Sequence, residues 1–159
     1  MIAYAWSDNR MKISTKGRYG LRALLDLAVH SNGEHVPLSN IAERQEISEN
    51  YLEQVFSTLR KSGLIKSVKG AQGGYVLADK ISNIKVGTIL RVLEGDLSVA
   101  NEEISSQERF NLSFQHCLQV SVWDKMTESI NTLVDSITLE DLVQEYKSMR
   151  GKSAIMYYI

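Results

Sequence analysis

Apolar residues recur every three or four positions near the beginning of the chain and predict two helices there. The first predicted helix covers residues 15–30 and ends at Asn32-Gly33. Its apolar face is formed by Leu21, Leu24, Leu25, Ala28 and Val29. A second, shorter helix is predicted between Pro37 and about Glu46, where Ile41, Ala42 and Ile47 supply a short apolar face.

A third predicted helix has one apolar and one polar face. Ser48 is expected to cap it by accepting a hydrogen bond from an amide of the first turn, and Gly63 is expected to end it. The apolar face carries Tyr51, Leu52, Val55, Phe56 and Leu59. The opposite, polar face carries Asn50, Glu53, Gln54 and Ser57.

The apolar period changes from 3.6 to 2 after residue 63, which predicts a β-hairpin. Its strands are expected at residues 64–68 and 75–77, and Gly70, Gly73 and Gly74 favour a flexible tip between them. Three helices followed by a hairpin are typical of a winged helix-turn-helix. We therefore predict a mainly α-helical fold with a small β-hairpin wing.

The remaining sequence predicts a short helix at 86–93, a polar loop at 101–108 and one long helix at 110–137. The long helix carries an apolar stripe of Phe110, Phe114, Leu118, Val122, Met126, Ile130, Leu133 and Ile137. A helix of this length measures about 42 Å, which exceeds what a small domain needs, so the stripe must meet something outside the winged head. Thr138 and Asp141 resemble a capping box, which predicts a last short helix through Tyr146.

Composition narrows the class of protein. The chain has 159 residues, 43% of them hydrophobic, and is long enough to bury a core without a metal or a disulfide. One cysteine excludes a disulfide framework and a zinc site made only of cysteines. No segment approaches the roughly 18 consecutive apolar residues of a membrane span, and residues 1–10 are too short and polar for a signal peptide. We expect a cytoplasmic protein with no membrane partner.

The formal net charge of −1 disfavours a nucleic-acid partner until it is divided by region. Residues 11–80 contain ten Lys/Arg and seven Asp/Glu, whereas residues 81–159 contain seven and eleven. We therefore expect residues 11–80 to form a DNA-binding domain, residues 81–159 to dimerise and respond to an effector, and residues 1–10 to be a flexible extension. A charge of +3 on the head is equally compatible with an ordinary solvated surface.

The predicted head has chemistry that suits duplex DNA. The major groove accommodates a helix, and Asn, Gln and Glu side chains contact base edges there. Lys66 and Lys69 flank a hairpin whose glycines would let backbone amides approach phosphates or the minor groove. Lys12, Lys16 and Arg18, at the beginning of the first helix, add charge and amides for a phosphate. The pattern alone also allows an ordinary helical interaction module.

Five segments resemble the Rrf-two family of bacterial winged-helix transcription regulators. They are residues 11–20 (MKISTKGRYG), 47–54 (ISENYLEQ), 59–64 (LRKSGL), 68–75 (VKGAQGGY) and 137–142 (ITLEDL). The resemblance implies a homodimeric repressor in which the long helix crosses its twin and places two winged heads on a palindromic operator. It also implies that the third helix and the wing contact the DNA.

Two sets of candidate residues follow. The candidate DNA contacts are Lys12, Lys16, Arg18, Tyr19, Ser48, Asn50, Tyr51, Glu53, Gln54, Arg60, Lys66, Lys69, Gln72 and Gly73. The candidate dimerisation residues are Phe114, Leu118, Val122, Met126, Ile130, Leu133 and Ile137.

Three of the DNA candidates have a qualification or a second interpretation. Tyr51 begins the apolar face of its helix and is equally a core residue. Glu53 can only accept, for example from a cytosine amino group, so it would select by excluding wrong bases as much as by attraction. Arg60 pairs either with a phosphate or with Glu49 or Glu53 on the helix surface.

Iron–sulphur members of the family hold their cluster with three cysteines in the loop before the long helix. The corresponding stretch here, residues 101–117, has only Cys117. Because a cluster needs several thiolates or equivalent ligands, we expect no cofactor and no metal site. We interpret Cys117 as a buried small hydrophobe, with a redox-sensing thiol as the alternative. His30 and His35 have no partner at a useful spacing and are interpreted as surface residues.

The missing cysteines and the tail Ile155-Met156-Tyr157-Tyr158-Ile159 look more like the cysteine-metabolism repressors of the family. The resemblance to these repressors implies a cysteine synthase-type enzyme as a partner that senses sulphur status. The apolar tail is then either a docking segment or a dimer-packing segment.

The sequence contains few features of an enzyme active site. The segment 70–74 lacks the Gly-Lys-Ser/Thr ending of a phosphate-binding loop, and the three histidines and scattered acids form no evident catalytic set. Two alternatives to the repressor stay open. They are a helical interaction dimer without DNA binding and a cluster- or thiol-based redox sensor of the same family.

Overall fold

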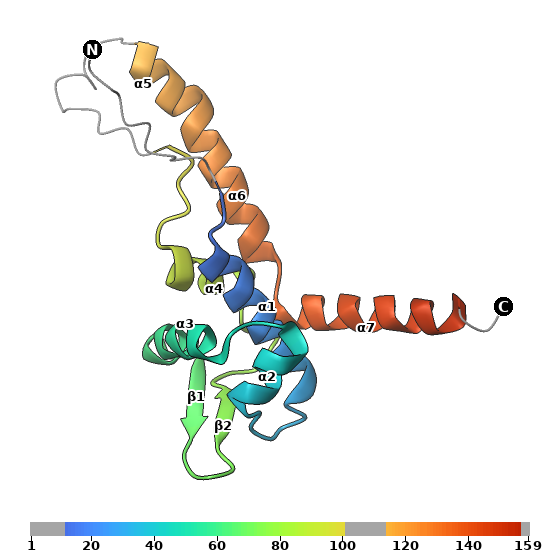
Figure 1. Ribbon diagram of the computed structural model, residues 1–159. Coiled ribbons are helices and arrows are strands. Elements are labelled where there is room, and N and C mark those ends of the chain that lie inside the picture. The colour runs from blue at the N-terminus through green and yellow to red at the C-terminus, as the bar shows by residue number, and fades with distance from the viewer. Residues whose placement is uncertain (1–11, 101–113, 157–159) are drawn as a thin grey trace, which may run out of the picture.

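The computed structural model describes residues 12–100 and 114–156 (Figure 1). Helices α1 (Thr15–His30), α2 (Leu38–Gln45) and α3 (Glu49–Lys61) confirm the three helices predicted for the head. The expectations for residues 1–10 and for the loop 101–108 lie outside the described residues, as do the side chains of the tail 155–159.

Local chemistry sets the ends of these helices. The Ser14 hydroxyl accepts a hydrogen bond of 3.3 Å from the Gly17 amide and caps α1. Glu46 adopts a left-handed conformation, with φ of 54°, and makes the turn from α2 into α3. Ser48 precedes α3, but its side chain makes no capping hydrogen bond, so the predicted cap is wrong. Only its carbonyl takes part, by accepting from the Leu52 amide in the first bond of the helix.

One apolar core joins these helices to α4 (Val86–Glu94). Its largest fully buried side chains are Leu24, Leu27, Ile41, Leu52, Val55, Phe56, Leu59, Ile65, Ile89 and Leu139. Helix α1 contacts α2, α3, α4 and the last helix, so it is the scaffold of the head. Gly20 permits the close packing of α1 on α4, because a Cβ there would overlap the Leu93 side chain.

Strands β1 (Ile65–Val68) and β2 (Gly74–Leu77) form the predicted antiparallel hairpin, with Ile65 opposite Leu77. Val36, in the α1–α2 connection, is bridged to β2. The Val36 amide donates to the Tyr75 carbonyl and the Tyr75 amide donates to the Val36 carbonyl, both at 2.9 Å. A Cβ on Gly74 would overlap the Val36 carbonyl, so a glycine is required where the wing joins the head.

The described part of the long predicted helix consists of three consecutive segments that project from the head, while residues 110–113 lie outside the described residues (Figure 1). They are α5 (Phe114–Leu118), the π-helical turn η1 (Gln119–Trp123) and α6 (Asp124–Ser136). The helix ends at Ser136, so placing Ile137 on its stripe was wrong. Ile137 is extended, and its carbonyl accepts a 2.9 Å hydrogen bond from the Val86 amide, because the chain pairs with the beginning of α4 at this point.

Arg91 fastens the long helix to α4. Its guanidinium donates two hydrogen bonds of 2.8 Å to the Asp135 carboxylate and further bonds to the Asn131 side-chain oxygen. These bonds from Arg91 lower the pKa of Asp135 and raise the pKa of Arg91. Gly87 makes room for the pair, since a Cβ there would overlap the Asp135 carboxylate.

Replacing Asp135 by Asn is expected to weaken the α4–α6 contact most near neutral pH. Because folding lowers the pKa of Asp135, its stabilising contribution is complete above the usual carboxyl pKa of about 4 and is lost as the pH falls through the lowered value. The difference in unfolding midpoint between the wild type and Asp135→Asn should therefore shrink from pH 7 to pH 3. Glu128→Gln, on the exposed side of α6, is the control, and an Asp135→Asn difference independent of pH would contradict this role.

The predicted capping box is confirmed at the beginning of α7 (Leu139–Met156). The Thr138 amide donates to the Asp141 carboxylate at 2.8 Å, and the Asp141 amide donates to the Thr138 hydroxyl at 3.1 Å. The first of these bonds lowers the pKa of Asp141. The prediction that this helix is short was wrong, because it continues beyond Tyr146 to Met156 and leaves the head in another direction from the long helix (Figure 1).

Candidate nucleic-acid interface

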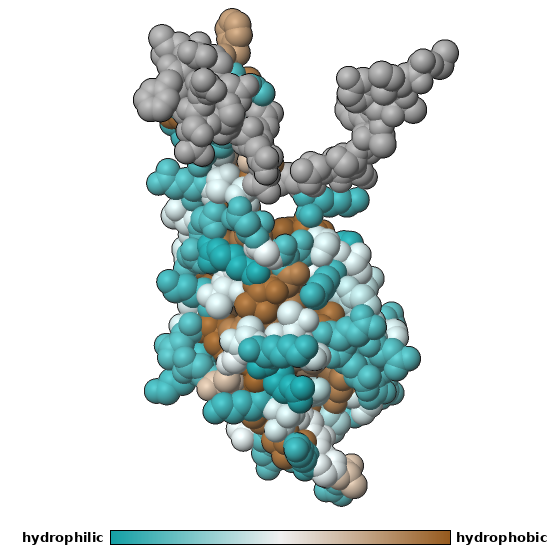
Figure 2. All heavy atoms as spheres, turned by 90° about the vertical axis from the view of Figure 1, so that its left-hand side faces the viewer, coloured by the Kyte–Doolittle hydropathy of each residue, from teal (hydrophilic) through white to brown (hydrophobic). Residues whose placement is uncertain are grey.

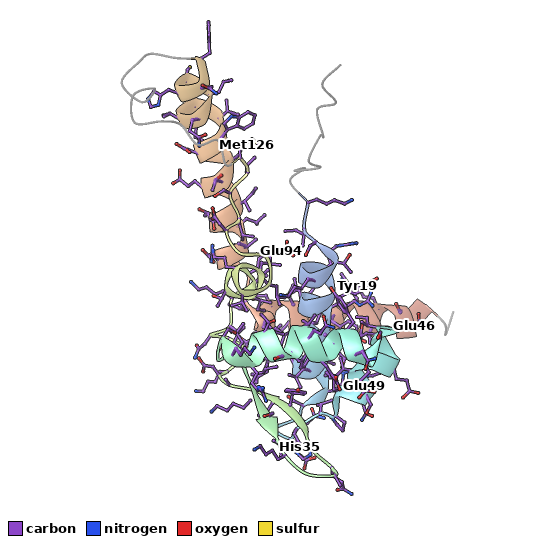
Figure 3. The ribbon with its side chains drawn as sticks, turned by 60° about the vertical axis from the view of Figure 1, so that its left-hand side comes forward. Tyr19, His35, Glu46, Glu49, Glu94 and Met126 are labelled. Atoms are coloured by element: carbon purple, nitrogen blue, oxygen red, sulfur yellow. The ribbon has the colours of Figure 1, made fainter. Side chains whose placement is uncertain are left out.

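Helix α3 lies between the beginning of α1 and the wing (Figure 3). All three elements carry candidate DNA contacts, and α3 holds the polar face that the sequence predicted to enter a groove. A helix flanked on both sides by basic segments suits a duplex, whose phosphate strands border each groove.

The outer face of α3 is exposed and polar. Asn50, Glu53 and Gln54 are exposed, because Leu52 and Phe56 fill the core on the opposite side of the helix. Glu49 is also exposed near the N-terminal end of the helix (Figure 3). These side chains are therefore free to reach a bound partner.

Tyr51 is half-buried and packs against the core. It also contacts Tyr19, which is another candidate DNA-binding residue. Its ring meets the Tyr19 ring edge-on, with centroids 6.0 Å apart, and the Arg22 guanidinium lies 5.0 Å from the Tyr19 centroid. Arg22 also donates to the Gln45 carbonyl at the end of α2. Tyr51 thus helps to position α3 through packing. No sequence pattern indicated Arg22, because its role depends on the angle between α1 and α2.

The wing presents exposed polar groups beside α3. Lys66, Lys69 and Gln72 are exposed, and Gly73 is half-buried. The Gly73 amide donates to the Gly70 carbonyl at 3.0 Å, which closes the tip. A Cβ on Gly73 would overlap the Val68 carbonyl. A glycine is therefore required at this position because the backbone packs closely here.

The beginning of α1 presents basic side chains to solvent. Lys12 and Arg18 are exposed and Lys16 is half-buried, as a phosphate contact allows. The Ser14 amide and hydroxyl, however, donate to the Glu94 carboxylate at 3.2 and 2.5 Å. Glu94 thus binds the Ser14 amide and hydroxyl, and Lys12, Lys16 and Arg18 supply the positive charge at this end.

Arg60 lies in the last turn of α3 and is exposed. Among the described residues it forms no ion pair with Glu49 or Glu53, so that interpretation was wrong. Contact between Arg60 and a phosphate stays a prediction.

Asp26 is a buried carboxylate that the sequence did not single out. It is 3% exposed and accepts hydrogen bonds from Arg44 at 2.6 to 3.2 Å and from Gln45 at 2.6 Å. His30 lies 3.4 Å from the same carboxylate, and the Asp26 side chain raises the pKa of Arg44. This network fixes α2 on α1, and with it the turn into α3. The available signal was an acidic residue between Leu25 and Leu27, in an apolar part of the α1 sequence.

Comparisons with known proteins decide the family. Residues 13–145 match the family model Rrf2, described as "Iron-dependent Transcriptional regulator". The chain belongs to the Rrf2 family. Among curated relatives, it is 42% identical over 133 residues to the HTH-type transcriptional regulator IscR of Yersinia enterocolitica, covering 84% of this chain and 79% of that protein. It is 39% identical over 153 residues to CymR of Bacillus subtilis, covering 94% of this chain and 100% of that protein.

Solved structures of the Rrf2 family agree. The B. subtilis CymR structure, titled "the Global Cysteine Regulator", matches with a TM-score of 0.71 and 40% identity over 84% of this chain and 97% of that chain. The T. potens IscR structure matches with a TM-score of 0.67 and 47% identity over 85% of this chain and 88% of that chain. The predicted winged helix-turn-helix fold is confirmed, and the protein is a DNA-binding transcription regulator. Its matched relatives are regulators rather than enzymes.

The description of the Rrf2 family as iron-dependent raises the question of a cluster. The whole chain has one cysteine, whereas a thiolate-held cluster needs several. Within residues 12–100 and 114–156, no three His, Cys, Asp or Glu side chains are grouped as metal ligands. The residues present do not fit a cysteine-ligated cluster.

In the described part of the chain, residues 12–100 and 114–156, no helix is long and apolar enough to cross a membrane.

Cys117 is exposed, so its interpretation as a buried hydrophobe was wrong for the single chain. It lies on α5, at the end of the long helix that projects beyond the head, where the core of the head does not reach (Figure 1). Its role as a redox-sensing thiol stays a prediction.

Proposed function

We propose that this Rrf2 protein is a homodimeric repressor that places two winged heads on a palindromic operator. The observation that carries the proposal is the apolar stripe of the long helix, which the head leaves uncovered. Phe114, Leu118 and Leu133 are 92%, 48% and 60% exposed. Large apolar side chains gathered on one projecting element are typical of a protein interface.

The stripe suits a second copy of the same helix. Met126 is also exposed, and Val122 and Ile130 are half-buried, so six candidate dimerisation residues line the described helix. Figure 2 shows the projecting part of the molecule above the head, with apolar atoms at its far end. Two such helices crossing would cover both stripes and hold two heads at a fixed separation, as a two-fold operator requires.

Each head would bind one half of the operator. The exposed face of α3, with Asn50, Glu53 and Gln54, would enter the major groove, while the wing and the beginning of α1 would contact the flanking backbone. In this account residues 11–80 bind DNA and residues 81–159 dimerise and respond to an effector.

The regulated genes are proposed to be those of cysteine or sulphur metabolism. Two observations support this choice: the single cysteine does not fit a cluster, and the match to CymR extends over the whole length of that regulator. A cysteine synthase-type enzyme is the proposed partner that reports sulphur status, with the apolar tail 155–159 as a docking or dimer-packing segment.

Affinity for mixed-sequence duplex DNA is expected to fall steeply with salt, because bound lysines and arginines displace counterions from phosphates. Lys69→Ala and Lys16→Ala should each weaken binding and reduce the slope of log affinity against log salt by about one per head. Fluorescence anisotropy over a salt series measures both quantities.

Lys147→Ala is the matched control, since Lys147 is an exposed lysine of α7 outside the proposed interface. It should leave the slope unchanged. A double variant of Lys16 and Lys69 that keeps the wild-type slope would contradict the proposed backbone contacts.

A further inference from the structure

The tip of the wing, residues 69–73, has little of the hairpin to hold it in place. Lys69 and Gln72 are exposed beyond the last strand pair, Val68 and Gly74, and the Gly73 amide donates to the Gly70 carbonyl within the tip. Gly70 has a φ of 119°, which only glycine adopts readily, and a Cβ there would meet no atom within 4 Å. A tip of this kind samples many conformations unless another part of the head fixes it.

His35 supplies such a contact from the α1–α2 connection. Its Nε2 lies 2.5 Å from the Gln72 carbonyl oxygen, and the two residues are 37 positions apart in the sequence. A carbonyl only accepts hydrogen bonds, so Nε2 carries the proton and donates. Figure 3 shows His35 beside the hairpin. The sequence pattern predicted that His35 is a surface residue without a partner, and the structure corrects this.

The backbone around His35 is itself held in place. The next residue, Val36, exchanges two hydrogen bonds of 2.9 Å with Tyr75 of β2, and Tyr75 packs edge-on against buried Phe56 at 5.0 Å. The imidazole therefore extends from an anchored strand segment rather than from a loose loop. It joins the core of the head to the tip of the wing at a second point, beyond the Val36–Tyr75 pair.

We propose that His35 is a positioning residue for DNA binding, which holds the wing tip so that Lys69 and Gln72 meet the DNA in one geometry. The proposal rests on the wing contact under the proposed function. A tip held in place before binding loses less conformational freedom on contact with DNA than a free tip does. Loss of the His35 bond should therefore weaken binding without removing any group that touches DNA.

The test compares His35→Ala with His35→Gln. Glutamine keeps an N–H donor at a similar reach, whereas alanine removes the donor. His35→Ala is expected to speed amide hydrogen exchange at the wing tip, Gly73 above all, and to weaken binding to mixed-sequence duplex DNA about five-fold. His35→Gln should restore most of both quantities. Thermal unfolding of the two variants is the check that the head stays folded.

A mutant cycle with the combined Lys69→Ala and Gln72→Ala variant separates positioning from direct contact. If His35 acts through the wing, His35→Ala should change affinity less than two-fold in a background that carries both Lys69→Ala and Gln72→Ala. The same five-fold loss in both backgrounds would overturn the proposal, because His35 would then contact DNA independently.

The exchange measurement uses the protein without DNA and is therefore independent of the binding data. Unchanged exchange at the wing tip in His35→Ala would overturn the role of His35 in holding the tip. If Lys69→Ala did not weaken DNA binding, the proposed wing contact would fail and the DNA role of His35 with it. Faster exchange in His35→Ala would then show that the fault lies in the wing contact and not in the His35 bond.

Discussion

Leu118→Glu combined with Leu133→Glu is expected to convert the protein to a monomer and to weaken operator binding by at least about 100-fold. Two linked heads bind a two-fold site much more tightly than one head, and the gain from linkage typically reaches 10² to 10⁴. The two glutamates would place charges on the stripe that the proposed dimer buries. Sedimentation equilibrium measures the first effect and titration of the operator the second.

The design keeps the fold of the single chain intact, because both leucines are largely exposed in it. Thr132→Glu combined with Ser121→Glu adds the same two charges at exposed polar positions of the long helix and is the matched control. It should leave both the molecular mass and the affinity unchanged. A double leucine variant that stays dimeric would refute the stripe as the dimer interface.

Arg44→Met is expected to reduce the free energy of unfolding by about 3 kcal/mol, since it leaves the Asp26 carboxylate buried without its main partner. For a chain of this size the melting temperature should fall by roughly 10 °C. Arg44→Lys keeps the charge but loses the paired geometry of the guanidinium, so it should cost less. Urea denaturation followed by circular dichroism measures these differences.

A second replacement separates the lost ion pair from lost packing. Asp26→Leu combined with Arg44→Met removes both charges, and it should recover much of the stability lost in Arg44→Met alone. Glu43→Gln, an exposed neighbour of Arg44, is the surface control. A change below 0.5 kcal/mol in Arg44→Met, roughly the effect of an ordinary surface substitution, would contradict the structural role of the Asp26 network.

The parts of the fold predicted correctly from the sequence depend on local patterns. The bounds of α1, the amphipathic α3 and the glycine-rich hairpin follow from periodicity and turn residues within a few positions of each other. The Thr138–Asp141 capping box is equally local. The polar face of α3 was placed toward solvent for the same reason, since its apolar face had to form the core.

The features that the sequence did not predict depend on contacts between distant residues. Glu94 reaches Ser14 across 80 positions, and His35 reaches Gln72 across 37. The long helix ends at Ser136, where the extended Ile137 pairs its carbonyl with the Val86 amide at the beginning of α4. The length of α7 was also not predicted, because the helix continues past Tyr146 and Gly151 to Met156.

The net charge of −1 shows that a value averaged over the whole chain can also mislead a prediction of function. It is the sum of a basic head and an acidic remainder, and taken alone it disfavours the partner that the family binds. A charge of only +3 on residues 11–80 further implies weak non-specific binding by a single head. Useful affinity should then come from two heads bound to one operator.

Selection from a pool of random duplexes determines whether two heads of one dimer bind one palindromic operator. The full-length protein is incubated with duplexes at physiological salt, and the bound fraction is amplified and sequenced over several rounds. For a dimer with two heads on one operator, we expect an inverted repeat whose half-sites are separated by a whole number of helical turns, about 10 base pairs each. Enrichment of a single unrepeated site, or of no sequence at all, would contradict a dimer that binds a palindromic operator.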